Sequence, residues 1–400
     1  MKLEPYAKLP LSKVARIERG KFSARPRNDP MYYGGETPFL QTGDIARAGR
    51  VITNWTQTLN ELGLGVSKLF PRDTIFMSIA ANIGDVAISG FDAACPDSVV
   101  AVKPRDDVDH EWLFQTLKFS KKELSALSTQ NAQANLSLKK IEPFKVHVPS
   151  LRDQSEIAAI LQTWDEAHEK LSGLRAAKDK RLGALRAALL FGELRLNGQR
   201  RNWVPTRLAA VTHELTGRNG AKGLGRDYVM GVTKAQGVVP MREQTVAGDI
   251  SRYKRLPPRA FAYNPMRINV GSIAMNERDE EVLVSPDYVV FACNADGLDP
   301  DYLDHLRKTS WWAHYINSGG SGSVRQRTYY DDLAALKLPL PELDEQKAIA
   351  AVLTTARDDL YATEREIEAV KLQKRGLMQK LLTGEWRVQT AEKGSTEAAE

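Results

Sequence analysis

IEPFKVHVPSLRDQSEIAAIL, residues 141–161, reappears as LAALKLPLPELDEQKAIAAVL, residues 333–353, and this duplicated stretch decides the fold. The match continues without a gap to ALLFGELRL, residues 188–196, and KLLTGEWRV, residues 380–388. One offset relates the paired Pro, Gln and Gly residues, since 341 − 149 = 346 − 154 = 384 − 192 = 192. A period of nearly half the chain is several times that of a solenoid or propeller repeat. The sequence therefore contains two copies of a whole module.

Length and composition indicate a globular protein of two to three domains. The chain has 400 residues, of which 42% are hydrophobic and 26% are charged, enough to bury ordinary cores. No run approaches the roughly 18 to 20 apolar residues that span a membrane, and the N-terminus lacks an apolar signal-peptide core, so we expect a cytoplasmic protein. The net charge of +6 permits an anionic partner without requiring one.

Each module opens with a mixed α and β globule of roughly 150 residues. Alternating apolar residues, β-branched side chains and flanking Gly or Pro predict β-hairpins in both copies. The paired segments are a short helical signature at 9–15 and 203–209, hairpin regions at 37–52 and 226–241 and at 70–89 and 256–275, a further strand at 95–104 and 285–294, and an amphipathic helix at 112–127 and 302–316. The offset drifts here, from 205 − 10 = 195 at Pro10 and Pro205 to 271 − 84 = 187 at Gly84 and Gly271.

A long helix with an apolar seam follows each globule. Apolar or small residues recur at spacings of three and four in the second copy, with Lys374 as an interruption, and the first copy has a register slip near Leu174. The seam positions are Ile349, Leu353, Ala356, Leu360, Thr363, Ile367, Val370, Leu377 and Leu381, and in the first copy Ile157, Leu161, Trp164, Leu171, Leu174, Leu182, Leu185 and Leu189. Helices of some 35 to 40 residues are roughly 50 to 60 Å long. Each can cover its seam with the other, packed antiparallel, or with its own globule. Gly192 and Gly384 stand where helix C-caps belong.

The predicted fold class is therefore α+β. Two tandem mixed α/β domains are separated by two long antiparallel coiled-coil helices, with pseudo-two-fold symmetry. The expected boundaries are 1–150 for the first globule, 151–196 for the first helical spacer, 197–342 for the second globule and 343–388 for the second spacer. The polar tail, residues 389–400, is expected to be disordered.

The residue patterns of enzymes are largely missing. No GxxxxGK[ST] phosphate loop occurs. Pro96-Asp97 followed by Ala101-Val102-Lys103 has the look of a nuclease metal site but lacks the second carboxylate, and Asn264-Pro265-Met266 only faintly resembles an amino-methyltransferase loop. Cys95 and Cys293 are isolated, so neither a disulfide framework nor a zinc site is supported. The six histidines form no metal-binding pair: His110, His147, His168, His213, His305 and His314. We expect neither a metal nor a catalytic residue in this chain.

Recognition is the signal that remains, because polar and basic residues gather in corresponding loops of the two globules. Arginine reads guanine through O6 and N7, Asn or Gln reads adenine through N6 and N7, and Lys or Arg on phosphates adds salt-dependent affinity. For any single residue, the alternative is that it belongs to an ordinary solvent-exposed loop and does not contact DNA. The candidate DNA-binding residues are Lys21, Arg25, Arg27, Asn82, Gln130, Asn131, Gln133 and Asn135 in the first globule, and Arg218, Lys222, Arg226, Lys234, Arg267, Asn269, Arg325, Gln326 and Arg327 in the second.

The chain resembles the specificity subunits of type I restriction-modification systems up to about Val388. The most specific likeness is the junction used twice, VPSLRDQSEI at 148–157 and LPELDEQKAI at 340–349, followed by a leucine-rich helix end that closes on Gly. Gly43, Gly84 and Gly271 fit the hairpin turns of the family's target-recognition domains. Two departures are Ser150-Leu151, where a second proline is common, and Val148 in place of Leu or Ile.

The resemblance implies a non-catalytic subunit that binds double-stranded DNA through two target-recognition domains held apart by the long helices. It also implies two modification subunits, which methylate adenine with S-adenosylmethionine, and restriction subunits as further partners that need ATP and Mg²⁺. No cofactor is expected in this chain, and no membrane partner. The residues expected at the helical spacer and subunit interface are Gln154, Ile157, Leu161, Trp164, Gln346, Ile349, Leu353 and Leu360.

Because the globules differ in sequence, an asymmetric bipartite target is expected. The alternatives are a stand-alone nuclease or methyltransferase with a duplicated core, and a DNA-binding regulator or scaffold without enzyme partners.

Overall fold

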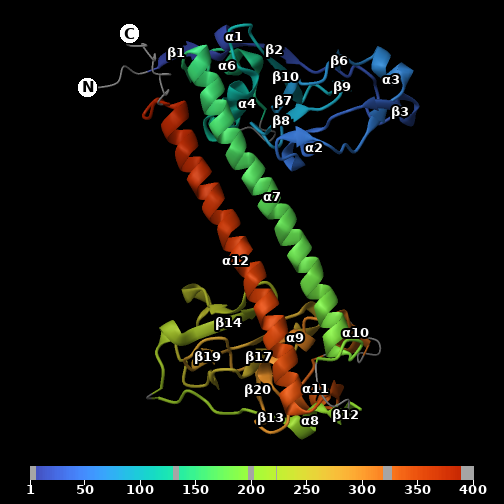
Figure 1. Cartoon of the computed structure of the whole chain (residues 1–400), viewed down its shortest axis with the longest axis vertical. Coiled ribbons are helices and arrows are strands. Elements are labelled where there is room, and N and C mark those ends of the chain that lie inside the picture. The colour runs from blue at the N-terminus through green and yellow to red at the C-terminus, as the bar shows by residue number, and fades with distance from the viewer. Residues whose placement is uncertain (1–5, 129–134, 197–201, 222, 319–326, 389–400) are drawn as a thin grey trace, which may run out of the picture. The chain divides into compact units, whose positions relative to one another are not determined.

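The computed structural model describes the chain except residues 1–5, 129–134, 197–201, 222, 319–326 and 389–400. It divides into two compact units. The first comprises residues 1–172 and 366–400, and the second residues 173–365. Both long helices, α7 (Leu151–Leu190) and α12 (Leu343–Leu382), cross this division, so each unit contains one globule and half of each long helix (Figure 1).

A five-stranded sheet forms the centre of the first unit. Its order is β2 (Ala15–Arg19), β10 (Val99–Pro104), β7 (Ile75–Ser78), β8 (Val86–Ser89) and β4 (Val51–Ile52). Neighbours are antiparallel except β4, which is parallel to β8. Successive side chains of a strand point to opposite faces. Ile75 and Met77 accordingly enter one hydrophobic core and Phe76 the other, so the sheet is buried on both faces.

Short elements complete the first globule. β1 (Ala7–Pro10) pairs with β11 (Lys145–Val148), and two further pairs are β3 (Tyr33–Pro38) with β5 (Thr58–Leu59) and β6 (Leu69–Phe70) with β9 (Ala93–Ala94). The helices are α1 (Leu11–Val14), η1 (Pro30–Tyr32), α2 (Thr42–Arg47), α3 (Glu61–Gly65), α4 (His110–Phe119), α5 (Lys121–Ala126) and α6 (Leu138–Ile141).

The second globule has two four-stranded sheets. One has the order β13 (Thr212–Glu214), β20 (Val289–Cys293), β17 (Phe261–Tyr263) and β18 (Ile273–Met275), and the other β15 (Gly237–Pro240), β14 (Val229–Thr233), β19 (Val282–Val284) and β16 (Lys254–Leu256). β12 (Val204–Arg207) pairs with β21 (Lys337–Leu340). The helices are α8 (Leu208–Val211), η2 (Arg226–Tyr228), η3 (Glu243–Thr245), η4 (Ile268–Val270), α9 (Pro300–Leu306), α10 (Ser310–Ser318) and α11 (Tyr330–Ala334).

The α+β class is confirmed, and so are the hairpins β7–β8, β14–β15 and β17–β18. The hairpin prediction for residues 37–52 is wrong, because helix α2 separates β3 from β4. The backbone N–H of Gln41 donates to Asp44 Oδ2 at 2.8 Å in a capping box that starts this helix. Gly43 therefore lies in a helix and not in a hairpin turn, whereas Gly84 and Gly271 have the positive φ of turn glycines. Each expected amphipathic helix is also two helices, α4–α5 and α9–α10.

Within each unit the two long helices run antiparallel. In the second unit Lys178 pairs with Asp359 at 2.7 Å and the earlier Arg175 with the later Glu364 at 2.9 Å. Leu182 and Leu189 of α7 share a core with Ile349, Leu353 and Leu360 of α12, and in the first unit Ile157 and Leu161 share one with Met378 and Leu381. Both cores also contain globule residues, so each helix half packs on the other helix and on a globule. Leu174 is 45% exposed, so the prediction that it belongs to the seam is wrong. It lies where the register slip was expected.

Lys374, the interruption in the seam, is a buried charge with partners. Lys374 is 8% exposed, and its Nζ lies 2.5 Å from Asp165 Oδ1 of α7 and 3.1 Å from Gln115 Oε1 of α4. Gln115 Nε2 also donates to Asp165 Oδ2 at 2.8 Å. A buried charge is tolerated where it is paired and hydrogen-bonded. This polar contact joins both long helices to the first globule.

Both long helices end in the same way. Gly192 and Gly384 have φ of 74° and 79°, the left-handed conformation in which a side chain is strained. The N–H of Leu194 donates to Ala188 O at 2.9 Å and that of Trp386 to Lys380 O at 3.0 Å, six residues back in each case, as in a Schellman motif. The predicted C-cap glycines are confirmed.

The strand registers correct the sequence alignment near the N-terminus. Ala7 pairs with Val148 and Val204 with Leu340, and these partners are equivalent by the offset 340 − 148 = 192. Ala7 therefore corresponds to Val204, an offset of 204 − 7 = 197. The equivalence of Pro10 with Pro205 at 195 is wrong, because a shared proline is weaker evidence of correspondence than a hydrogen-bonded register.

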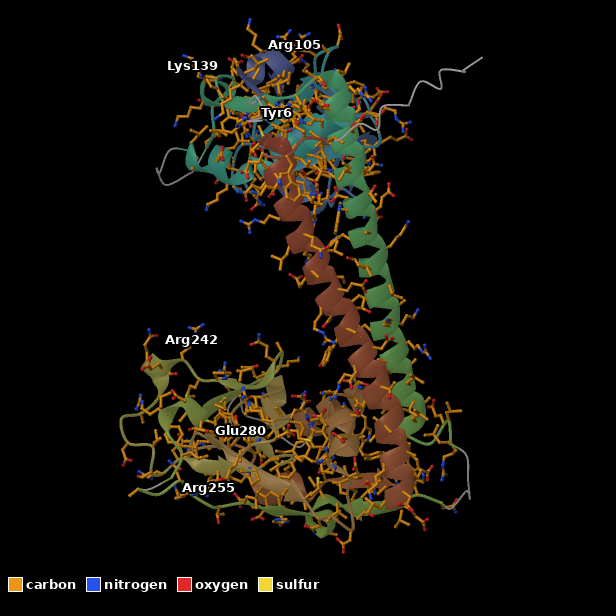
Figure 2. All side chains as sticks on the ribbon, turned by 60° about the vertical axis from the view of Figure 1, so that its left-hand side comes forward. Tyr6, Arg105, Lys139, Arg242, Arg255 and Glu280 are labelled. Atoms are coloured by element: carbon orange, nitrogen blue, oxygen red, sulfur yellow. The ribbon has the colours of Figure 1, made fainter. Side chains whose placement is uncertain are left out.

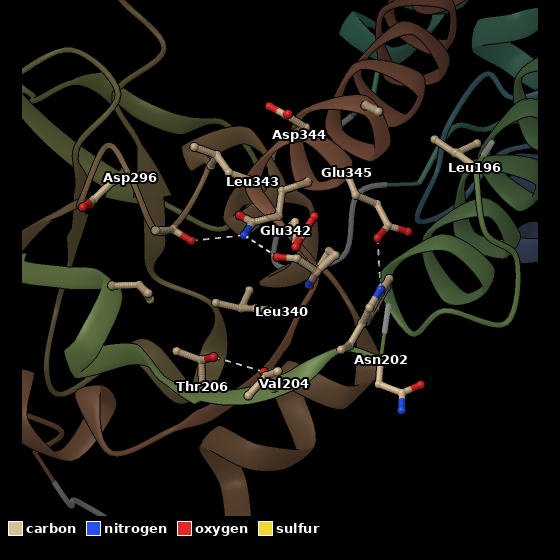
Figure 3. Close-up of a pocket in the computed structure, with 16 residues that line it drawn as sticks. Leu196, Asn202, Val204, Thr206, Asp296, Leu340, Glu342, Leu343, Asp344 and Glu345 are labelled. Carbon is tan, nitrogen blue, oxygen red and sulfur yellow. Dashed lines mark hydrogen bonds between the residues drawn. The ribbon is translucent and has the colours of Figure 1, made fainter. Parts of the chain in front are cut away.

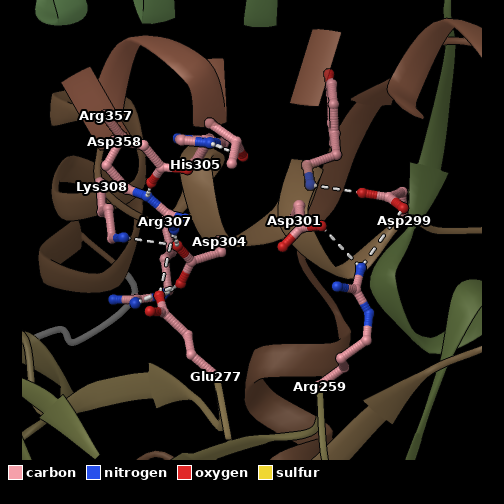
Figure 4. A network of polar contacts seen from close by, with 12 residues as sticks. Arg259, Glu277, Asp299, Asp301, Asp304, His305, Arg307, Lys308, Arg357 and Asp358 are labelled. Atoms are coloured by element: carbon pink, nitrogen blue, oxygen red, sulfur yellow. Dashed lines mark hydrogen bonds and ion pairs between the residues drawn. The ribbon is translucent and has the colours of Figure 1, made fainter. Parts of the chain in front are cut away.

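A charged cluster lies between α9 and α12 in the second unit (Figure 4). Asp304 is 1% exposed and pairs with Arg307 at 2.5 Å and Lys308 at 2.6 Å. Burial by itself would raise the pKa of Asp304, but these two cations lower it to about 2. His305, fully buried beside it, has its pKa lowered to about 3 by burial and by Arg186. Its Nε2 lies 3.1 Å from Thr354 Oγ1 of α12.

We expect Asp165→Ala to lower the free energy of unfolding by about 3 kcal/mol, because Lys374 would keep its burial and lose its counter-charge. Urea denaturation of the full chain measures this. Asp165→Ala combined with Lys374→Met is the control, and the double variant should lose less than the single one. An unfolding midpoint of Asp165→Ala equal to that of the wild type would contradict the assignment.

We expect the second unit to lose stability as the pH falls below 6.5. Unfolded His305 gains a proton near 6.5 and the folded residue only near 3, so protons favour the unfolded state between these values. The loss attributable to Asp304 comes later, below the unfolded value of 3.8. Hydrogen exchange of α9 between pH 7.5 and 5 measures the effect. His305→Gln should flatten this dependence, and an unchanged slope would exclude His305 as its source.

Candidate nucleic-acid interface

Three loops converge in the second unit and bring together four of the predicted DNA-binding residues. Lys234 lies in the β14–β15 turn, and its Cγ and Cδ would be 3.0 Å from a Cβ added to Gly271, which follows η4. Arg267 and Asn269 belong to this η4 loop and are exposed. The N–H of Thr328 donates to Pro265 O at 3.0 Å, which places Arg327 beside the same loop. Two arginines, a lysine and an amide thus share one surface.

The corresponding loops of the first unit also lie together, but the side chains that they expose are different. An isolated bridge joins Ala80 to Asn135, and the N–H of Leu136 donates to Ile79 O at 2.8 Å. Exposed Asn82 and Asn135 therefore lie on adjoining segments. The N–H of Ile79 donates to Ser98 O at 2.9 Å, so the segment that carries Asp97 borders the same place. Two amide side chains face solvent here.

Arg27 reaches this region through an ion pair. Its Nη1 and Nη2 donate to the two carboxylate oxygens of Asp97 at 3.0 and 2.8 Å. The hydrogen bonds and charge of Arg27 hold the pKa of Asp97 below its usual range. Asp97 is the carboxylate of the nuclease-like motif Pro96-Asp97. In the structure it orients the Arg27 guanidinium. Among the described residues no group of three or more His, Cys, Asp or Glu could hold a metal ion.

The other described candidates belong to other loops. Arg25 donates to Ala24 O at 2.7 Å, Arg218 to Arg252 O at 2.9 Å and Arg226 to Ala247 O at 2.6 Å, so each guanidinium also braces its own loop. Lys21 is exposed next to Phe22. Six candidates lie outside the described residues: Gln130, Asn131, Gln133, Lys222, Arg325 and Gln326.

Gln154 and Gln346, predicted at the spacer, fasten each long helix to the preceding globule. Gln154 Oε1 accepts the N–H of Asp109 at 2.8 Å and its Nε2 donates to Pro149 O at 3.1 Å. Gln346 does the same with Asp299 at 2.9 Å and Pro341 at 3.0 Å. The two aspartates are the N-caps of α4 and α9. The repeated glutamine is thus a joint between two helix starts.

The apolar residues predicted at the spacer face inward. Five of them are buried in the two cores, while Trp164 is half-buried. The buried five are Ile157, Leu161, Ile349, Leu353 and Leu360. Contact with another subunit would therefore have to come from exposed neighbours of these residues.

Exposed Gln236 and Met266 accompany the second-unit cluster and were not among the predicted residues. Gln236 is two residues beyond Lys234 in the same turn, and Met266 precedes Arg267. Polar residues within a recognised turn were the available signal for Gln236. No sequence signal pointed to Met266, because periodicity does not predict the exposure of an apolar residue in a loop.

The fold and the loops describe a duplicated protein whose two units present unlike polar surfaces. Residues 4–176 match the family model described as the type I restriction modification DNA specificity domain. Among curated proteins, the MjaVIII specificity subunit of Methanocaldococcus jannaschii is 23% identical over 88% of this chain and 85% of its own length. The EcoprrI specificity subunit of Escherichia coli is 23% identical over 91% of this chain and 90% of its own length.

Solved structures agree on the fold. The S subunit of a type I restriction-modification system from M. genitalium superposes with a TM-score of 0.61 at 13% identity, covering 96% of this chain and 98% of that one. A chain from work on assembly and conformational transition of the type I system gives 0.56 at 16% identity, over 96% and 100%. Residues 4–176 thus carry a type I restriction modification DNA specificity domain, and the chain is similar over most of its length to specificity subunits of type I restriction-modification systems. No helix in the described part of the chain is long and apolar enough to cross a membrane.

Proposed function

We propose that this chain is the specificity subunit of a type I restriction-modification system and reads a bipartite, asymmetric DNA target, with one half-site for each unit. The observation that carries the proposal is the loop cluster of the second unit, where Lys234, Arg267, Asn269 and Arg327 gather on one exposed surface. Arginine suits guanine, amides suit adenine, and lysine suits phosphate. The first unit offers Asn82 and Asn135 at the matching place, so the two half-sites would differ in sequence.

The long helices support the bipartite form of the target. Each has 40 residues and is therefore about 60 Å long. At about 3.4 Å per base pair, reading surfaces carried by such helices would address half-sites within roughly 18 base pairs of each other.

We further infer that the chain acts with partner subunits. Two modification subunits would methylate adenine with S-adenosylmethionine, and restriction subunits would contribute ATP- and Mg²⁺-dependent steps.

Mapping methylated adenines in DNA from cells with and without this chain tests the proposal. We expect one asymmetric bipartite motif to be methylated only when the chain is present. Methylation that does not depend on the chain would contradict the proposal. Methylation by the purified chain alone would instead identify a stand-alone methyltransferase.

Replacement of a single arginine tests the assignment of the second half-site. We expect Arg267→Ala to weaken recognition by about 1–3 kcal/mol and to relax sequence preference only in that half-site. Competition binding with DNA altered in one half-site at a time measures this. Arg278→Ala is the matched control, since Arg278 is exposed in the same unit but lies 3.7 Å from Glu280 and outside the loop cluster. An equal loss on every sequence would assign Arg267 to phosphates.

A further inference from the structure

Among the described residues, three ion pairs join α7 to α12 inside the two units. They are Asp165 with Lys374 at 2.5 Å in the first unit, and Lys178 with Asp359 at 2.7 Å and Arg175 with Glu364 at 2.9 Å in the second. Lys374 is the most deeply buried of these residues, since it is 8% exposed. Charged pairs across a helix seam select the partner of a helix as well as its direction.

The duplicated sequence does not repeat these pairs. Arg357 is the equivalent of Asp165, since 357 − 165 = 192, and Leu182 is the equivalent of Lys374, since 374 − 182 = 192. An arginine and a leucine in the second unit therefore occupy the places of the buried acid and lysine. The places of the other two pairs hold uncharged residues in the first unit, Ala167 with Val370 and Ser172 with Ile367.

Two copies of α7 packed antiparallel in this register would lose all three ion pairs. The new contacts would be Asp165 with Leu182, Lys178 with Ala167 and Arg175 with Ser172. Asp165 would keep Gln115 at 2.8 Å and Lys118 at 3.7 Å, but it would lose its nearest cation. Removing one partner of a buried ion pair costs on the order of 100-fold in an equilibrium constant.

Two copies of α12 would bring like charges together. Lys374 of one copy would lie against Arg357 of the other, and it would lose Asp165. Arg357 has three acids in its own unit, Asp358 at 3.1 Å, Glu277 at 3.3 Å and Asp304 at 4.0 Å. Of these only Asp304 is buried, and it already pairs with Arg307 and Lys308. The remaining acids of the seam, Asp359 and Glu364, would face Val370 and Ile367.

The contacts at the helix ends, in contrast, are alike in both units. In the first unit the guanidinium carbon of Arg387 lies 3.8 Å from the centre of the Tyr6 ring (Figure 2). Its equivalent Arg195 lies 5.3 Å from the centre of the Trp203 ring, whose Nε1 donates to Glu345 at 3.3 Å (Figure 3). An arginine and an aromatic ring would meet at the ends in any pairing of the two helices. Discrimination between pairings therefore has to come from the interior charges.

We propose that these charges make the pairing of the long helices selective. The seam surface of α7 fits α12 and not a second copy of α7, and that of α12 fits α7 and not a second copy of α12. The leucines and isoleucines of the seam recur in both copies and would by themselves allow every pairing. The charged positions disfavour the pairings of like helices, because those pairings leave Asp165 without Lys374 or bring Lys374 against Arg357. Each assembly then contains one unit of each kind, whatever ligand the units bind.

Cleavage of the folded full chain at a protease site inserted between Leu196 and Asn202 tests the proposal. The two fragments are separated in urea, the urea is removed, and native mass spectrometry counts mixed pairs and like pairs of fragments. We expect the wild type to return mixed pairs, with like pairs at least about 100-fold rarer. Asp165→Leu combined with Lys374→Leu should raise like pairs of the first fragment at least about ten-fold, because a contact between leucines suits both pairings.

Lys380→Leu is the matched control. Lys380 also belongs to α12, but its side chain is 41% exposed and pairs with Glu385 beyond the end of the same helix. This variant should return the same fragment pairs as the wild type. Like pairs as common as mixed pairs in the wild type overturn the proposal. A double variant that still returns only mixed pairs also overturns it, because the selection would then come from other residues.

The intact chain provides the test where the fragments fail to reassemble. Lys374→Leu creates within the first unit the contact of Asp165 with leucine that two copies of α7 would make. We expect the unfolding equilibrium constant, measured in urea, to rise at least about 30-fold, and the further change Asp165→Leu to restore most of the loss. A Lys374→Leu chain as stable as the wild type overturns the proposal, and so does a double variant no more stable than Lys374→Leu.

Discussion

A helix of 40 residues with an apolar seam must have that seam covered along its whole length, and the rest of this structure depends on that requirement. The chain meets it by antiparallel pairing within each unit, where half of α7 faces half of α12. Leu182 and Leu189 face Ile349 and Leu353 in one unit, and Ile157 and Leu161 face Met378 and Leu381 in the other. One core of each globule is continuous with these seams, whereas the cores around Phe76 in the first globule and Met230 in the second contain no residue of the long helices.

This requirement accounts for how much the sequence could predict. Residues 141–196 and 333–388 align without a gap because helices that share a seam cannot change length independently. Their period, their glycine caps and the antiparallel pairing were all predictable from spacing. The loops tolerate insertions, and there the hairpin prediction is wrong at α2, because Thr42-Gly43-Asp44 is compatible with a turn as well as with a helix start.

The interior polar contacts were less accessible to sequence analysis. Lys374 could be seen as a break in the seam, but Asp165 and Gln115, its partners, are 209 and 259 residues away in the chain. Gln154 and Gln346 stood out by repetition, yet their role as joints between helix starts needed the geometry. Arg267 and Lys234 could each be chosen as polar loop residues, but only folding brings their loops together. Proximity between distant segments is a property of packing, which local patterns do not encode.

The division of the long helices has a consequence for the order in which the chain matures on the ribosome. The second unit consists of one uninterrupted segment, residues 173–365, and has all of its parts once that segment has emerged. The first unit needs residues 366–388 as well, including Lys374 and Arg387, which are synthesised after the second unit. Domains fold as they are synthesised, so long-range closure waits for its final strand or helix. The globule that leaves the ribosome first is therefore completed last, and until α12 has emerged it holds an open seam that only the final turns of α12 can fill.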